Sequence, residues 1–262
     1  MISVRGLSKA YAGRPALQDL SLRAAAGEMC VVLGPSGAGK TTLLRCINRL
    51  VEPDGGDIVI DGQPAPTTRA GLRALRQSAA MIFQDHHLVP RLSALKNVLT
   101  GRLASLPLTL SLLQIFPGRD VDIALDCLQR VELRERAWSR ADRLSGGERQ
   151  RVGIARALAQ QPRVILADEP VASLDPKTAR VVLNDLRRAA HELNIAVLCN
   201  LHQVEYAREF ADHLVGISAG RTVFDGSVAQ LDDAALERIY SGDLQAKLSG
   251  LGTDRSEGPR TT

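Results

Sequence analysis

The sequence predicts an α/β fold with a mostly parallel sheet, an N-terminal antiparallel β subdomain and an inserted α-helical subdomain. The parallel sheet is predicted from short, continuous apolar runs, which are typical of strands buried on both faces. These runs occupy residues 29–34, 78–84, 163–170 and 195–201. The antiparallel part is predicted from residues 2–5 and 17–23, where apolar and polar side chains alternate loosely. Helical periodicity dominates residues 94–160, which indicates a helical insertion between the second and third runs.

The first half of the chain gives local signals for its remaining elements. A glycine-rich loop after residue 34 leads into a helix expected over about residues 40–50. DIVIDG (57–62) predicts a strand and a turn. Inside the helical region we expect breaks where turn-forming residues gather. These breaks are predicted at Pro107, at Pro117–Gly118 and at Ser145–Gly147.

The second half adds a long helix, a hairpin and a tail. Residues 177–193 have the apolar spacing of an amphipathic helix. HLVGIS and RTVFDG flank Ala219–Gly220, which predicts two strands joined by a tight turn. Residues 245–262 show no apolar pattern, so we expect a disordered tail there.

The composition of the 262-residue chain suits a globular protein with a sizeable core, because 45% of its residues are hydrophobic and 24% are charged. The net charge is only +4 and the arginines are scattered, so no nucleic-acid partner is expected. The four cysteines form no paired motif and are expected to be free thiols. The longest uncharged stretch, residues 103–118, is too short to cross a bilayer.

A phosphate-binding pattern follows the first apolar run. GPSGAGKT (34–41) matches G-x-x-x-x-G-K-[ST] at every fixed position, between a predicted strand and a predicted helix. Glycines let backbone N–H groups surround phosphates, Lys40 would reach the β- and γ-phosphates, and the Thr41 hydroxyl would bind Mg²⁺. We therefore expect a P-loop NTPase core that binds ATP and Mg²⁺. The nucleotide-binding residues expected here are Gly34, Pro35, Ser36, Gly37, Ala38, Gly39, Lys40, Thr41 and Thr42.

Two carboxylates end the third apolar run, RVILADEP (163–170). A phosphate-binding loop needs an acidic partner for its metal ion, so Asp168 is expected to hold Mg²⁺, mostly through water. Glu169 is the expected catalytic base, which would orient a water for attack on the γ-phosphate. The two residues could instead only end the strand and cap the next turn. The phosphate-binding loop favours the catalytic interpretation.

A second glycine motif, LSGGE (144–148), precedes an arginine-rich helical pattern. The Ser145 hydroxyl and the N–H groups of Gly146 and Gly147 at a helix start would favour an anion. An ordinary helix cap is the alternative. One chain does not need a second phosphate site for the same nucleotide, so the motif raises the question of which phosphate it binds.

LSGGE, LADEP (166–170), SLDP (173–176) and a strand ending near His202 resemble the ATP-binding subunits of ABC transporters, in order and spacing, from about residue 2 to 240. The resemblance implies a head-to-tail dimer in which residues 145–147 of one copy contact the ATP of the other. It further implies that Tyr11 stacks on adenine and that Gln84 contacts Mg²⁺ and the attacking water. His202 would bond the γ-phosphate, and Asp175 would lie in a loop that crosses to the other copy. Asp175 is also expected to cap the helix that begins at Pro176.

The closer resemblance is to the ATP-binding subunit of phosphonate importers, on NVLTGRL (97–103), ILADEPVASLDP (165–176), NLHQVE (200–205) and VFDG (223–226). It implies an ATP-hydrolysing motor that drives membrane permease subunits and depends indirectly on an external solute-binding protein. Residues 1–244 would form the ATP-binding domain, with the helical subdomain inserted at about 87–160. The protein would lie on the cytoplasmic face of the cell membrane as a peripheral subunit.

Several alternatives stay open from the sequence. The solute could be a phosphate ester, phosphite or an amino acid instead of a phosphonate. A soluble ATPase of the same family acting on nucleic acid, or a nucleotide-binding regulator without turnover, would also contain a phosphate-binding loop. The uncharged residues 103–116 could either pack in the core of the helical subdomain or dock a membrane subunit.

Overall fold

The main sheet is a parallel one with a single antiparallel strand at one edge. We describe a computed structural model, which defines residues 1–84 and 87–240. The sheet has the strand order β10-β9-β3-β8-β7-β6. Its strands are β3 (Met29–Leu33), β6 (Ala79–Ile82), β7 (Val164–Asp168), β8 (Ala196–Asn200), β9 (His213–Ser218) and β10 (Arg221–Gly226). Only β10 pairs antiparallel, in a hairpin with β9, which confirms the predicted α/β class and the predicted hairpin.

Both faces of this sheet are covered, which explains the continuous apolar runs. Every residue of β3, β7 and β8 is buried. On β8, Ala196 and Leu198 face the cluster that includes α1 (Lys40–Ile47), while Val197 and Cys199 face the cluster on the opposite side. The helices α7 (Pro176–Leu193) and α8 (Val204–Phe210) belong to that opposite cluster.

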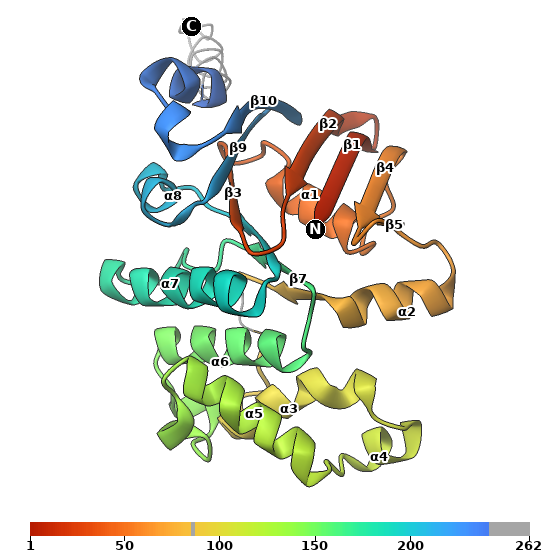
Figure 1. The fold of residues 1–262 in the computed structure, drawn as a ribbon, viewed down its shortest axis with the longest axis vertical. Coiled ribbons are helices and arrows are strands. Elements are labelled where there is room, and N and C mark those ends of the chain that lie inside the picture. The colour runs from red at the N-terminus through yellow and green to blue at the C-terminus, as the bar shows by residue number, and fades with distance from the viewer. Residues whose placement is uncertain (85–86, 241–262) are drawn as a thin grey trace, which may run out of the picture.

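The N-terminal strands form a separate antiparallel sheet in the order β2-β1-β4-β5, as predicted. Its members are β1 (Ile2–Tyr11), β2 (Arg14–Ala24), β4 (Gly55–Ile60) and β5 (Gln63–Pro64). Figure 1 shows this sheet beside α1 and far from the helices at the bottom of the view. The strands β1 and β2 are longer than the sequence pattern indicated, because several register shifts interrupt the alternation between them.

Helices fill the chain between β6 and β7. The helices α3 (Ala94–Leu99), α5 (Gly118–Arg130) and α6 (Gly146–Ala159) pack on one another (Figure 1). Short 3₁₀ turns at 100–105, 134–136 and 141–143 connect them, and a further turn lies at 228–230. A buried ion pair joins this region, because Arg102 Nε donates to Asp120 Oδ1 over 2.7 Å and Arg102 Nη1 donates to the Ala159 carbonyl over 2.8 Å.

Three predicted boundaries are wrong. The helix α1 ends at Ile47 and not near residue 50, because Arg49 takes a left-handed φ of 52°. Ser78 belongs to a helix, α2 (Arg69–Ser78), and not to a strand. The strand β6 ends at Ile82, so Gln84 lies beyond it. The helix α2 was not predicted, although it is amphipathic; it is short, and Leu75 is its one buried residue.

The uncharged stretch 103–116 contains α4 (Leu108–Leu113), a short helix with no buried residue. Leu108, Leu112 and Leu113 are about 70% exposed, and Ile115 is 53% exposed. Core packing of this helix, one of the two interpretations, is therefore wrong for the single chain. Docking remains a prediction.

The remaining expectations concern the ends of elements and the tail. A helical segment covers residues 233–240, at the end of the described part. The predicted tail, 245–262, lies outside the described residues. Within 1–84 and 87–240, no helix combines the length and the apolar character that crossing a bilayer requires.

Candidate nucleotide-binding site

The loop between β3 and α1 has the backbone that phosphate binding requires. Gly39 caps α1 with a φ of 104°, and a Cβ there would lie 2.5 Å from the Ala16 carbonyl oxygen. Gly37 has a φ of 80°, and no atom lies within 4 Å of the position that its Cβ would take. Gly39 is thus required for packing, whereas Gly37 leaves open space above the loop. N–H groups at this helix start favour an anion in that space.

The side chain of Lys40 is held over the same loop by hydrogen bonds to the carbonyl groups of the loop. Its Nζ donates to the Gly34 carbonyl over 2.7 Å and to the Pro35 carbonyl over 3.0 Å. It also lies 3.4 Å from His202 Nδ1. Burial lowers the pKa of Lys40, while the nearby carboxylates of Glu169 and Asp168 oppose that shift. The ammonium group is therefore buried, fixed and available for exchange with a stronger acceptor.

Asp168 ends β7 next to the first residues of α1. Its Oδ1 accepts a hydrogen bond from Thr41 Oγ1 over 3.0 Å and another from Asn200 Nδ2 over 2.8 Å. A hydroxyl and a carboxylate are hard oxygen ligands, which suit Mg²⁺. Among the residues that the structure describes, no cluster of three or more His, Cys, Asp or Glu side chains could hold a metal ion. The donor set thus fits Mg²⁺ bound together with phosphates and water, and not a structural zinc site.

Glu169 and His202 contact each other across the ends of β7 and β8. Glu169 Oε1 lies 2.5 Å from His202 Nε2. Glu169 has a left-handed φ of 51°, a strained conformation for a residue with a side chain. Such strain costs roughly 1–3 kcal/mol and is common at functional sites. The strained turn places the carboxylate beside the phosphate-binding loop.

These groups line one open cavity of about 280 Å³. The lining residues are Tyr11, Ala16, Ser36, Gly37, Ala38, Gly39, Lys40, Thr41, Thr42, Glu169 and His202. Gly34 and Pro35 adjoin it through Lys40, and Asp168 adjoins it through Thr41. Tyr11 is 45% exposed at the edge. The cavity therefore brings together residues that the sequence separates by almost two hundred positions.

Five further predicted site residues neither line nor adjoin this cavity. Gln84 is exposed, immediately before residues 85–86, which the structure does not describe. Ser145, Gly146 and Gly147 form the start of α6, and Asp175 caps α7. None of these residues lines the space above the phosphate-binding loop of its own chain.

The starts of α6 and α7 are fixed side by side. Ser145 Oγ accepts the Glu148 N–H over 3.2 Å, and Glu148 Oε2 accepts the Ser145 N–H over 2.8 Å, which forms a capping box. A Cβ on Gly147 would lie 2.2 Å from Thr178 Cγ2, so only glycine allows this approach. Asp175 accepts the N–H groups of Lys177 and Thr178. A hydrogen bond from the Thr178 side chain, together with these backbone bonds, holds the pKa of the Asp175 carboxyl below its usual value. Two helix N-termini thus meet on one surface.

Comparison with known proteins decides the family. Residues 17–172 match the family model described as ABC transporter. The chain belongs to this family. Its P-loop core is therefore that of an ABC ATPase. Proteins of this class bind ATP and couple its hydrolysis to transport.

Relatives support this membership over nearly the whole chain. The chain is 52% identical over 241 residues to the phosphonates import ATP-binding protein PhnC 3 of Nostoc sp., covering 92% of each chain. It is 54% identical over 243 residues to the phosphite import ATP-binding protein PxtA of Stutzerimonas stutzeri, covering 92% of this chain and 88% of the relative. The dimeric post-hydrolysis structure of the ATP-binding cassette MJ0796, bound to ADP and Pi, has a TM-score of 0.74 at 32% identity, covering 87% of this chain and 99% of that one.

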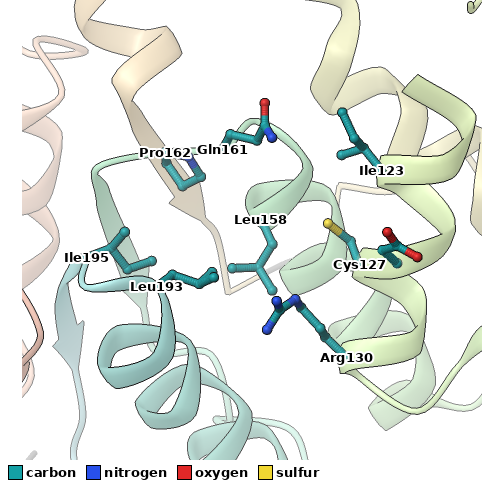
Figure 2. Close-up of a pocket in the computed structure, with 9 residues that line it drawn as sticks. Ile123, Cys127, Arg130, Leu158, Gln161, Pro162, Leu193 and Ile195 are labelled. Carbon is teal, nitrogen blue, oxygen red and sulfur yellow. The ribbon is translucent and has the colours of Figure 1, made fainter. Parts of the chain in front are cut away.

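A second cavity of the ABC ATPase lies away from the phosphate-binding loop. It has a volume of about 370 Å³ and lies between α5, the end of α6 and the segment that joins α7 to β8. Figure 2 shows Ile123, Cys127 and Arg130 of α5 on one side of Leu158, with Leu193 and its neighbours on the other. It contains none of the predicted site residues.

Sequence reasoning missed two residues of the site. Ala16 lines the cavity, with its carbonyl beside Gly39, and no local pattern marks an alanine for this role. Asn200 contacts Asp168, and its signal was present, because it is the one amide inside the apolar run IAVLCNL. A polar residue inside a buried strand requires a partner.

Proposed function

We propose that this chain is the ATP-hydrolysing motor subunit of an importer for phosphonates. One observation supports the proposal most directly. Lys40, Thr41, Glu169 and His202 meet in one cavity, while the residues of LSGGE lie outside it. This arrangement suits a protein that holds ATP in one copy and completes the site with another. The names of its relatives, which refer to phosphonate and phosphite import, suit the transport role.

Binding would begin with exchange of partners at the phosphate-binding loop. The N–H groups of residues 34–42 would receive the phosphates, and Lys40 would leave the carbonyls of Gly34 and Pro35 for the β- and γ-phosphates. Tyr11, exposed at the edge of the cavity, would stack on adenine. Thr41, Asp168 and Gln84 would hold Mg²⁺, which neutralises charge on the phosphates when it is bound.

Hydrolysis requires a base and a stabiliser of the γ-phosphate. Glu169 Oε1 contacts His202 Nε2, so the carboxylate is already occupied in this structure. With ATP present, His202 would turn to the γ-phosphate and release Glu169. The freed carboxylate would then accept a proton from the attacking water and orient it. Exchange of the His202 partner therefore links phosphate binding to activation of the base.

A second copy would complete the chamber. Ser145, Gly146 and Gly147 at the start of α6 would contact the γ-phosphate held by the partner, and Asp175 would approach from the neighbouring helix start. Enclosing a multiply charged anion between two helix N-termini excludes water and strengthens each hydrogen bond. Cassettes of this family do dimerise, as the MJ0796 structure illustrates.

The motor would work on permease subunits, with an external solute-binding protein delivering the solute, and would lie at the inner face of the cell membrane. Residues 1–244 form the proposed ATP-binding domain, with the helical subdomain at about 87–160. The exposed leucines of α4 are the proposed contact with a membrane subunit. Deletion of residues 104–116 should reduce co-purification with the permease, and an unchanged complex would contradict this contact.

The solute can be tested in cells that lack this chain. We expect loss of growth with methylphosphonate as the sole phosphorus source and normal growth with orthophosphate. Wild-type protein should restore growth and Lys40→Ala should not. Loss of growth on phosphite alone would assign phosphite as the solute instead. Normal growth on both, with recovery of the protein in RNA-bound fractions, would contradict the importer function.

A further inference from the structure

Asn200 occupies a position where a buried parallel strand usually has an apolar side chain. It is the last residue of β8 and pairs in register with Asp168, the last residue of β7. Ala196 and Leu198 precede it on the same face of the strand and belong to the apolar cluster around α1. Asn200 is nevertheless fully buried, with 0% of its surface exposed. Burying an amide at this position costs free energy unless the amide makes a hydrogen bond.

Within residues 1–84 and 87–240, the nitrogen of this amide has one hydrogen-bond partner, Asp168, which is the proposed metal ligand. Asn200 Nδ2 donates to Asp168 Oδ1 over 2.8 Å, and Thr41 Oγ1 donates to the same oxygen over 3.0 Å. Within the described part of the chain, no hydrogen bond reaches the other carboxylate oxygen, Oδ2. The two donors therefore fix the orientation of the Asp168 carboxylate through Oδ1 and leave Oδ2 available for another ligand.

The oxygen of the amide has no hydrogen-bond partner among the described residues. Asn200 Oδ1 is buried and accepts no hydrogen bond within the described residues. Reversing the amide would bring Oδ1 against the Asp168 carboxylate oxygen, where two acceptors repel, so Asp168 sets the orientation. A side chain selected only for packing would not leave a buried acceptor unpaired. The amide is therefore retained for the hydrogen bond that its nitrogen makes.

We propose that Asn200 is a positioning residue, which orients Asp168 so that Oδ2 faces the nucleotide-bound Mg²⁺ or its water. The proposal rests on the function proposed above, in which Asp168 serves the metal. Residues that orient a metal ligand typically change metal affinity by about 10- to 100-fold when they are removed. Asn200 should therefore affect the metal more than the nucleotide.

The test compares Asn200→Leu with Cys199→Ala, a change at the adjacent buried residue that faces the opposite side of β8. Binding of Mn²⁺ to the protein with a non-hydrolysable ATP analogue is titrated by electron paramagnetic resonance. Asn200→Leu should weaken Mn²⁺ binding about 10- to 100-fold. Its affinity for the analogue in EDTA should stay within about twofold of wild type, and Cys199→Ala should bind Mn²⁺ normally.

Three outcomes would overturn the proposal. Wild-type Mn²⁺ affinity in Asn200→Leu would show that Asp168 needs no orienting amide. An equal loss of analogue affinity in EDTA would assign Asn200 a purely structural role. If wild-type protein itself showed no metal-dependent binding of the analogue, the metal role of Asp168 would fail first. Asn200→Ala, which introduces no added bulk, repeats the measurement if the leucine variant does not fold.

Discussion

At the scale of single residues, each polar or charged group of the candidate site already has a partner within the protein. Lys40 bonds to carbonyls, Glu169 contacts His202, and Asp168 accepts from Thr41. Each group already has the charge or the hydrogen-bonding capacity that ATP hydrolysis requires. ATP binding would give each group a new partner. This exchange can be tested by removing one side chain at a time.

The first residue-scale prediction is that Lys40→Ala weakens ATP binding by about 10- to 100-fold, because a hydrogen bond to a charged group contributes about 1.5–3 kcal/mol. The measurement is a titration with a fluorescent ATP analogue. Lys96→Ala, at an exposed lysine of α3, is the control and should bind normally. Unchanged affinity in Lys40→Ala would contradict the assignment of the phosphate-binding loop.

The second residue-scale prediction concerns Glu169, the proposed catalytic base. Glu169→Gln should retain ATP binding but lose about 10²–10³ in hydrolysis rate, which is the usual effect of removing one well-placed group that stabilises the transition state. Release of inorganic phosphate and analogue titration measure the two properties separately. Turnover near that of wild type would refute the role of Glu169.

Residues in contiguous motifs were predictable from the sequence, and residues that act through tertiary contact were not. GPSGAGKT defines its own loop, so the positions of Gly34 to Thr42 followed from one segment. Asn200 depends on the register between β7 and β8, which no local pattern specifies. Ala16 depends on how the N-terminal sheet approaches α1, which is equally nonlocal.

At the scale of elements, a buried ion pair and its hydrogen bonds connect the parts of the helical region. Arg102 and Asp120 are both buried, and Arg102 also donates to Ala159 and Gln161 at the end of α6. Arg102→Leu should destabilise the protein by about 3–5 kcal/mol, because it leaves Asp120 buried without a partner.

Denaturant unfolding measures this effect, and the double variant Arg102→Leu/Asp120→Leu supplies the control. The double variant should be less destabilised than the sum of its single variants, because no uncompensated charge remains. Simple additivity would show that the two side chains contribute independently of each other.

A pH-dependent effect belongs to α7. Burial raises the pKa of Asp185 to about 6; Arg188 and Arg151 lower it, and Glu132 raises it further. Its Oδ2 has no hydrogen-bond partner within the described residues. Because the unfolded chain releases this proton near pH 4, the folded protein loses stability as the pH rises from about 4 to about 6.

Asp185→Asn should therefore stabilise the protein at pH 7.5, by up to about 3 kcal/mol, and should have little effect below pH 4. Urea unfolding at the two pH values tests this difference. Asp126→Asn, at an exposed carboxyl of α5, should change stability little at either pH. An equal effect of Asp185→Asn at both pH values would contradict the titration of Asp185.

Elements that bury a continuous apolar run were predictable, and short or exposed helices were not. The strands β3, β7 and β8 are buried on both faces, so their sequences are continuously apolar. The helix α2 is amphipathic, but it is short and buries one residue, and it was not predicted. The helix α4 is apolar but exposed. Its exposure was not predictable, because hydrophobicity alone does not indicate which surface covers a segment.

At the scale of the whole molecule, the residues of the proposed site lie on two separate surfaces. The phosphate-binding loop lines a cavity, and the start of α6 lies outside it. Ser145→Arg should abolish ATP-induced dimerisation while leaving ATP binding by the single chain intact, because the added side chain would fill the space for the partner's γ-phosphate.

Sedimentation of Glu169→Gln protein with ATP, with and without Ser145→Arg, measures the effect. The control is Ser227→Arg, because Ser227 also caps a turn through a capping box but at residues 228–230. Loss of ATP binding by monomeric Ser145→Arg would place Ser145 in the site of its own chain instead.

The separation of α6 from the cavity also has a genetic consequence. A variant that only removes the Ser145 hydroxyl, and does not block the approach of the partner as Ser145→Arg does, would still fold, bind ATP and pair with normal subunits. In a bacterium that expresses both the variant and the normal gene, each mixed dimer would contain one impaired ATP site. Such an allele should be dominant over the normal one, whereas an allele that prevents folding should be recessive.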